Sequence, residues 1–362
     1  MRVLHVIDSL ILAGAEVLLS EMLPRMRRRG LDVAVVVLKH LDSPLEIDLQ
    51  AAGFHFLPSR SSDIYSPLHI CSLAKHINSF DVVHSYLFPA QLWVAAAARL
   101  ASRRVPLVTS EPSTHNRRRR RWARPLDLWM YRNYKKITCN TKATAEYLIR
   151  WIPEVADRVS VIHNGVPVER FLDAEPANKA EVLPTANGRP VIMFVARFDS
   201  TKDHPTLLRA TRRVPDAELV LVGDGDSRPA MQQLASDLGI GNRVHFLGRR
   251  PDIPRLLKLA DLYVHASNSE GFGIAAVEAM SAGLPVLASD VPGLKEVVTG
   301  AGRLVAPSDE EALAKAIGEI LQSKQIRQRM AAASQKRAAH FNIDRTVDSL
   351  IEIYESVVCA GT

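Results

Sequence analysis

The chain has 362 residues, of which 47% are hydrophobic and 23% are charged, and its formal net charge is +7. This composition is that of a folded globular protein and argues against a disordered or fibrous chain. The length exceeds what one hydrophobic core supports, so two domains are expected.

No apolar stretch approaches the roughly 20 residues that a membrane-spanning helix needs. The first residues are interrupted too early, by Asp8, to read as a signal peptide. Three scattered cysteines without metal-ligand spacing fit a reduced, cytoplasmic compartment.

The first half of the chain alternates short apolar runs with longer patterns whose apolar residues recur three and four apart. The runs predict strands and the longer patterns predict amphipathic helices. Because the two alternate, we expect a parallel sheet wrapped by helices, a Rossmann-like N-terminal domain over residues 1–168. Its expected strands are 2–7, 32–38, 82–85, 106–109, 137–139 and 159–162, and its helices include 16–29 and 89–100.

A second series of the same kind follows a Pro- and Gly-rich stretch, 169–189, which reads as a linker. Its strands are expected at 191–195, 218–222, 244–246, 262–265, 285–288 and 303–305, within a second Rossmann-like domain over 190–340. A C-terminal helix is expected over 341–362, and packing back on the N-terminal domain is one option for it. The predicted fold class is α/β, with two doubly wound domains whose ligand-binding crevices can face each other.

A glycine-rich segment with two acidic residues precedes a predicted helix in the second domain. It reads SEGFGIAAVE over residues 269–278. Its glycines leave backbone N–H groups free at a helix start, where phosphate or sugar oxygens bind readily. Glu278 falls two helical turns beyond Glu270, on about the same side of the chain. A solvated helix start with an acidic first turn is the alternative for an isolated Glu pair.

This segment resembles the signature of the retaining GT-B glycosyltransferases, in particular glycosyltransferase family 4. The resemblance spans nearly the whole chain and is densest over 191–305. It implies that Glu270 contacts the hydroxyls of a nucleotide-linked sugar and that Glu278 holds the ribose. It also implies that the backbone at Gly271, Phe272 and Gly273 meets the sugar and the phosphates.

Two cations upstream match the same family. Arg197 leaves the end of a predicted strand and Lys202 follows a short polar turn, so both can converge at one sheet edge. A departing nucleoside diphosphate develops negative charge, which fixed cations stabilise without a metal. The resemblance assigns this role to Arg197 and Lys202. Taken singly, such residues are more often solvated surface charges.

Further landmarks agree with the family. The strand-end loop that carries Arg249 resembles the one beside the nucleobase. Asp224 and Asp226 lie in a Gly-rich turn, for which we prefer helix capping to a metal-binding pair, and no metal site is expected. In the first domain, Gly14 lets the chain approach a phosphate or an acceptor closely at a predicted helix start. A simple tight turn is the alternative there.

The acceptor side departs from the family pattern. His84 ends a predicted strand and is expected to face the crevice, where it could bind an acceptor hydroxyl, although a core histidine is equally compatible. In the family a His follows the Ser-Glu pair directly, whereas this chain has Pro112 after Glu111. We therefore take His115 as the candidate catalytic replacement. Glu111 is a second candidate for acceptor binding.

A basic segment, 117–136, holds nine Lys and Arg residues against Asp127 alone, and so accounts for the whole positive excess. With Trp122, Trp129 and Tyr131 interleaved, it is typical of a helix that lies at an anionic membrane surface. A solvated basic face over core aromatics is the alternative. Nucleic acid is not an expected partner, because no nucleic-acid-binding module accompanies the arginines.

The sequence therefore predicts a retaining, metal-independent hexosyltransferase without a cofactor. It would use a nucleotide sugar, UDP-linked by expectation, and a membrane-associated or glycan acceptor in polysaccharide or glycolipid assembly. It would work in the cytoplasm, peripherally at the inner face of the cell membrane. A sugar-nucleotide epimerase of the same architecture, or a non-catalytic partner that binds nucleotide or lipid, are the alternatives.

Overall fold

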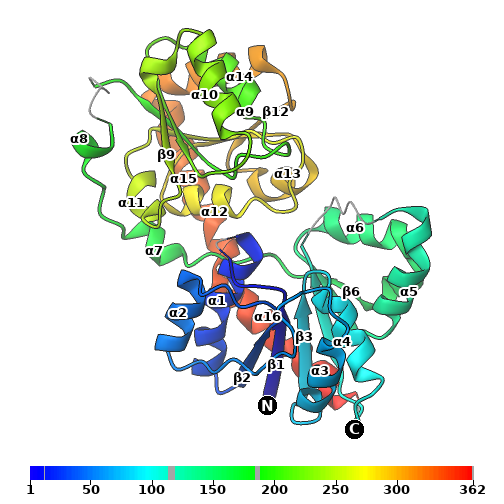
Figure 1. The fold of residues 1–362 in the computed structure, drawn as a ribbon. Coiled ribbons are helices and arrows are strands. Elements are labelled where there is room, and N and C mark those ends of the chain that lie inside the picture. The colour runs from blue at the N-terminus through cyan, green and yellow to red at the C-terminus, as the bar shows by residue number, and fades with distance from the viewer. Residues whose placement is uncertain (12, 113–118, 184–187, 361–362) are drawn as a thin grey trace. The chain divides into compact units, whose positions relative to one another are not determined.

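The computed structural model describes residues 1–11, 13–112, 119–183 and 188–360. The chain divides into two compact units (Figure 1). Unit 1 comprises Met1–Gly165 together with Ile343–Thr362, and unit 2 comprises Val166–Asn342. None of the helices in the described part of the chain combines the length and the hydropathy that crossing a bilayer would take.

Unit 1 is built on a six-stranded parallel sheet in the order β2-β1-β3-β4-β5-β6. Its strands are nearly continuous apolar runs because helices cover both faces of the sheet. The strands are β1 (Arg2–Ile7), β2 (Asp32–Val37), β3 (Val82–Tyr86), β4 (Leu107–Glu111), β5 (Lys136–Cys139) and β6 (Val159–Val161). The helices are α1 (Gly14–Arg28), α2 (Pro44–Ala51), α3 (His69–Ile77), α4 (Ala90–Ala98), α5 (Arg124–Arg132), α6 (Lys142–Trp151) and α16 (Ile343–Cys359).

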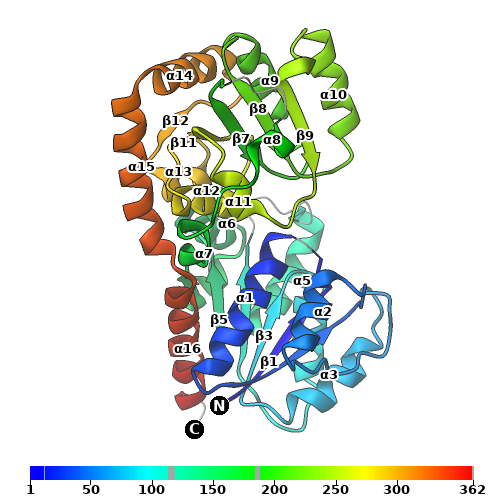
Figure 2. The same cartoon turned by 90° about the vertical axis from the view of Figure 1, so that its left-hand side faces the viewer.

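The C-terminal helix α16 belongs to unit 1, where it lies along α1 (Figure 2). Arg29, which directly follows α1, donates to Asp348 at 2.5 Å and to Asp344 at 2.9 Å. Tyr354 of α16 is fully buried, and its hydroxyl is 2.6 Å from the Nδ1 atom of His84 on β3. Surface ion pairs and a buried hydrogen bond thus fix the last helix to the first sheet.

Unit 2 is a second six-stranded parallel sheet, in the order β12-β11-β10-β7-β8-β9. Numbered within the unit this is the 3-2-1-4-5-6 order of a Rossmann fold, read from the other edge. The strands are β7 (Val191–Val195), β8 (Glu218–Val222), β9 (Val244–Gly248), β10 (Leu262–His265), β11 (Val286–Ser289) and β12 (Arg303–Val305). The helices are α7 (Val168–Leu172), α8 (Lys179–Val182), α9 (His204–Arg212), α10 (Arg228–Asp237), α11 (Ile253–Leu257), α12 (Ile274–Ser281), α13 (Pro292–Val298), α14 (Glu310–Gln322) and α15 (Lys324–Ala338).

The stretch 169–189, expected as a linker, contributes to the core of unit 2. Phe171 and Leu183 are 4% and 3% exposed and pack into the same cluster as β7 and β10. The boundary between the units falls earlier, between Gly165 and Val166. Its Pro- and Gly-rich composition predicted an irregular linker, but the short helix α8 and most of α7 lie within it, and these two apolar residues fix it to the core.

Candidate active site

The switch point of the unit 2 sheet lies between β7 and β10, which pair in parallel although β8 and β9 separate them in sequence. Connections from two such neighbours leave in opposite directions, and this opens a crevice at their carboxyl ends. The loop after β7 carries Arg197 and Lys202, and the loop after β10 carries Glu270. The topology therefore brings the residues of the two sequence motifs to one sheet edge.

Backbone contacts hold the loop after β7 in place. The Phe198 amide donates to the carbonyl of Asp224 at 3.0 Å. Gly223 and Gly225 have φ of +137° and +154°, and a Cβ atom on either would lie only 2.0 or 2.4 Å from the backbone oxygens of Ala196 and Phe198. Only glycine allows this approach. The Gly-Asp-Gly turn thus supports the Arg197 loop, and Asp224 caps it by accepting from the Gly225 amide at 2.9 Å.

Arg197 is bound to its own loop. Its Nε atom donates to Asp199 at 2.7 Å, while the rest of the side chain, 68% exposed, faces solvent. Asp199 also accepts from the Thr201 amide at 2.9 Å. Burial opposes ionisation of Asp199, but these hydrogen bonds outweigh it and lower its pKa. The guanidinium is thereby oriented while its terminal nitrogens stay accessible.

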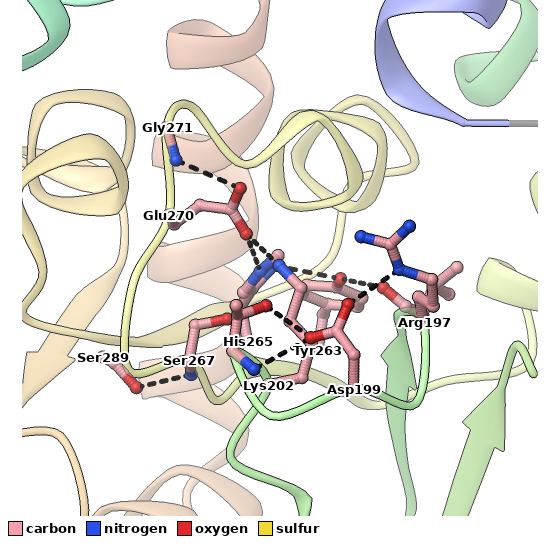
Figure 3. A network of polar contacts seen from close by, with 11 residues as sticks. Arg197, Asp199, Lys202, Tyr263, His265, Ser267, Glu270, Gly271 and Ser289 are labelled. Carbon is pink, nitrogen blue, oxygen red and sulfur yellow. Dashed lines mark hydrogen bonds and ion pairs between the residues drawn. The ribbon is translucent and has the colours of Figure 1, made fainter. Parts of the chain in front are cut away.

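Lys202 and Glu270 meet in a nearly buried ion pair, with side chains 15% and 17% exposed (Figure 3). An antiparallel bridge between Lys202 and Ser267 aligns the two loops, and the Ser267 amide donates to Ser289 Oγ at 3.0 Å. Two strand-end loops and one side chain of β11 therefore define the position of the lysine.

His265, the last residue of β10, completes this group. Its Nε2 atom is 3.0 Å from the same Glu270 oxygen that Lys202 binds. Burial lowers the His265 pKa despite that contact, so the ring is neutral and donates through Nε2–H. Burial alone would raise the pKa of Glu270, but the Lys202 ammonium and the His265 hydrogen bond bring it well below its usual value. Glu270 is a carboxylate with two donors on one oxygen.

The glycine-rich turn leads directly into α12. Gly273 has φ of +90°, and Gly293 packs so tightly that a Cβ atom there would lie 2.3 Å from the carbonyl of Glu270. The Phe272 ring is buried, edge-on to Phe341 with centroids 5.4 Å apart, so its side chain belongs to the core. The backbone of this turn, rather than the phenyl ring, lies at the sheet edge.

Tyr263 links the two acidic residues of the motif. This tyrosine is fully buried on β10, and burial followed by the charges of Glu278 and Glu270 raises its pKa well above the usual value. The charges of both carboxylates therefore reach this one side chain. Arg249 is exposed immediately after β9, the edge strand on the other side of β8.

The residues expected to bind an acceptor lie differently. His84 is fully buried, with Nδ1 at 2.6 Å from the Tyr354 hydroxyl and Nε2 at 2.8 Å from Ser110 Oγ, so the expectation that it faces a crevice is wrong. Glu111 is also interior, accepting from the Tyr131 hydroxyl at 2.5 Å. Gly14 is the exposed first residue of α1. His115 lies outside the described residues.

The basic segment is divided by the fold. Arg119 turns inward to Glu111, with a 3.6 Å separation, and Tyr131 is a core residue rather than part of an aromatic face. Trp122 and Trp129 are 74% and 37% exposed. Arg117 and Arg118 fall outside the described residues. Among the described residues of the segment, Arg119 and Tyr131 therefore do not belong to an outward basic and aromatic face.

Three site residues escaped the sequence reasoning: Asp199, Tyr263 and His265. A histidine at the end of a predicted strand, five residues before Glu270, was a usable signal for His265. Asp199 lies between the two cations and reads as a turn residue. Tyr263 is indistinguishable from a core aromatic until its neighbours are known.

Comparisons with known proteins identify the family. Residues 12–170 match the family model described as Glycosyltransferase Family 4, and residues 177–337 match the one described as Glycosyl transferases group 1. The lipopolysaccharide core biosynthesis glycosyltransferase LpsE of Rhizobium meliloti is 30% identical over 237 residues, which cover 64% of this chain and 67% of LpsE. The chain belongs to the GT-B glycosyltransferases of the family 4 type.

Other relatives of this glycosyltransferase extend the comparison. The D-inositol 3-phosphate glycosyltransferase of Nocardia farcinica is 33% identical over 238 residues, 62% of this chain, and the match spans only 53% of that protein. The crystal structure of Anabaena Alr3699/HepE in complex with UDP-glucose has a TM-score of 0.87 and 23% identity, with 98% of this chain and 100% of that chain covered. This glycosyltransferase thus shares the fold of a protein that was crystallised with a nucleotide sugar.

Proposed function

We propose that this protein is a retaining hexosyltransferase that takes a sugar from a UDP-linked donor without a metal ion. The observation that carries the proposal is the group formed by Lys202, Glu270 and His265 at the switch point of unit 2. Another protein with this fold has been crystallised with UDP-glucose. A cation and a carboxylate at one crevice fit the two halves of such a donor, diphosphate and sugar.

In the proposed donor complex, Lys202 exchanges Glu270 for a phosphate oxygen, and the accessible end of Arg197 binds the same diphosphate. Glu270, still held by His265, accepts from sugar hydroxyls. The backbone of Gly271 to Gly273 and the start of α12 receive phosphate or sugar oxygens. Glu278 binds the ribose, and the loop with Arg249 lies beside the nucleobase.

In the proposed reaction, the bond between sugar C1 and the diphosphate oxygen breaks while the acceptor oxygen bonds to C1 on the same face. The acceptor proton passes to the departing phosphate oxygen. Lys202 and Arg197 stabilise the charge that develops on the diphosphate. The configuration at C1 is then retained without a pair of carboxylates of the hydrolase type.

We further propose that the acceptor is a glycan or a lipid-linked molecule bound by unit 1 and presented at the inner face of the cell membrane. One relative is named for lipopolysaccharide core biosynthesis and another for D-inositol 3-phosphate, which suggests polysaccharide or glycolipid assembly. Gly14 at the start of α1 is the proposed point of close approach. His115 is the proposed acceptor-side group.

A panel of nucleotide sugars tests the proposal. We expect one donor to raise the thermal unfolding midpoint, since a ligand that binds only the folded state stabilises it. Lys202→Met should lose that stabilisation, while Lys179→Met, in α8 of the same unit, should keep it. Product analysis with the stabilising donor then separates the alternatives. Free epimerised donor would indicate an epimerase, and binding without turnover across a broad acceptor panel would indicate a non-catalytic partner.

A further inference from the structure

A surface pocket of about 340 Å³ lies in unit 1, apart from the residues proposed to bind the donor. It is formed by α5 and by Arg99, which directly follows α4. Its lining residues are Arg99, Pro125, Leu128, Trp129, Arg132 and Asn133.

The two arginines of the pocket differ from others near them. Arg119 is paired with Glu111, and Arg124 is paired with Glu154 at 2.7 Å. Arg99 and Arg132 are exposed, and within the described residues neither side chain forms an ion pair or a hydrogen bond. Glu154, which is already paired with Arg124, also interacts electrostatically with Arg132, but neither guanidinium of the pocket is ion-paired or hydrogen-bonded to it. Two such guanidinium groups at one pocket favour an anionic ligand, and a planar fork of N–H donors suits phosphate oxygens in particular.

An apolar rim accompanies these charges. Trp122, Leu126 and Trp129 recur at helical spacing and are 74%, 40% and 37% exposed, and Leu100 beside Arg99 is 67% exposed. Such side chains gain free energy when they enter the boundary between head groups and acyl chains. Free phosphate would use only the arginines. A phospholipid would use both the arginines and the rim.

We propose that this pocket binds the phosphate of an anionic phospholipid head group and seats unit 1 on the bilayer, with Trp122 and Leu126 in the interface. The inference deepens the membrane part of the proposed function and rests on it. It names Arg99, outside the basic segment, as a lipid ligand, and it removes Arg119 and Tyr131 from the membrane contact.

Co-sedimentation with vesicles tests the pocket. The full chain is mixed with vesicles of phosphatidylcholine alone, or of phosphatidylcholine with phosphatidylglycerol. The double variant Arg99→Gln/Arg132→Gln is compared with Arg28→Gln/Arg60→Gln, which removes two exposed arginines elsewhere in unit 1. We expect the pocket variant to bind the anionic vesicles about 30-fold more weakly, the loss expected for two basic side chains near the surface. The control should lose at most a few-fold.

Equal losses in both double variants, or none in the pocket variant, would overturn the proposal. Titration with inorganic phosphate separates the two sources of the anion. Binding of phosphate at the pocket without binding to vesicles would also overturn it. Trp122→Ala should weaken vesicle binding while leaving the thermal unfolding midpoint unchanged. Stabilisation by a nucleotide sugar, measured on the same variants, should be intact. Its absence in the unaltered protein would count against the proposed function and not against the pocket.

Discussion

Replacing Glu270 by Gln removes the negative charge that Lys202 binds but keeps an oxygen for the His265 N–H. The two partners are 15% and 17% exposed, so water screens their attraction only weakly. A hydrogen bond to a charged group contributes about 1.5–3 kcal/mol. A diphosphate that binds Lys202 has to break the contact between Lys202 and Glu270, and so loses most of this free energy. We therefore expect UDP, without a sugar, to bind Glu270→Gln about 5- to 30-fold more tightly than the unaltered protein, a gain of about 1–2 kcal/mol.

Isothermal titration with UDP measures this gain, and titration with UDP-glucose measures the accompanying loss. Because the sugar hydroxyls lose their carboxylate, the advantage of UDP-glucose over UDP should disappear in Glu270→Gln. Glu175→Gln, an exposed acid of unit 2, is the matched control for the change in net charge. If UDP binds Glu270→Gln no more tightly than the control, Lys202 is not the group for which carboxylate and diphosphate compete, and the reasoning fails.

Three further changes test the surrounding structure. His265→Leu removes the N–H that donates to Glu270, so kcat for transfer should fall about 10- to 100-fold. His265→Gln keeps an N–H and should retain most of the kcat of the unaltered protein, with little change in KM. Equal losses of kcat in the two variants would argue against a positioning role for His265. Burial raises the pKa of Asp8 to about 7, so the folded form is favoured while Asp8 is protonated, and stability should fall by up to about 4 kcal/mol between about pH 4 and pH 7. Urea denaturation of Asp8→Asn should show a gain at about pH 8 and almost none at about pH 4, and an unchanged pH slope would refute this. Gly223→Ala, at φ +137°, puts a Cβ atom 2.0 Å from a backbone oxygen, whereas Gly239→Ala, at φ +69° in the left-handed region, has nothing within 4 Å. We expect about 1 kcal/mol of destabilisation for Gly239→Ala and at least about 2 kcal/mol more for Gly223→Ala, from its close contact together with its less accessible φ, and similar unfolding free energies would contradict this.

The fold was predictable because buried parallel strands are written as short apolar runs. All twelve expected strands occur within two residues of their predicted bounds, and the helical region after 309 is present. Local patterns could not reveal which strands neighbour each other or that α16 packs on unit 1. The segment that carries Phe171 and Leu183 read as a linker because its few apolar residues show no helical or strand periodicity.

Site residues were predictable from the sequence where a motif fixes their spacing. They were not predictable where tertiary packing determines whether a side chain faces the site or the interior. Glu270 and Lys202 were predicted because their loops follow strands. The carboxyl ends of parallel strands lie at the same edge of a sheet, so these loops have to lie at that edge. Glu111 also ends a strand, and His84 was expected to end one but lies in the middle of β3, and each finds a tyrosine hydroxyl in the interior. Hydrogen-bond partners supplied by α16 and α5 lie far away in sequence, so no local signal announces them. His265 differs, because its partner Glu270 is only five residues away and the local signal was present but not used.

Equilibrium binding of UDP-glucose to the full chain in the presence of EDTA tests the central claim most directly, namely that Lys202 and Glu270 in unit 2 hold a nucleotide sugar without a metal. We predict one saturable site whose affinity is lost in Lys202→Met and unchanged in the control Lys179→Met. Affinity that is equal in all three proteins, or that appears only after a divalent metal is added, would contradict the claim.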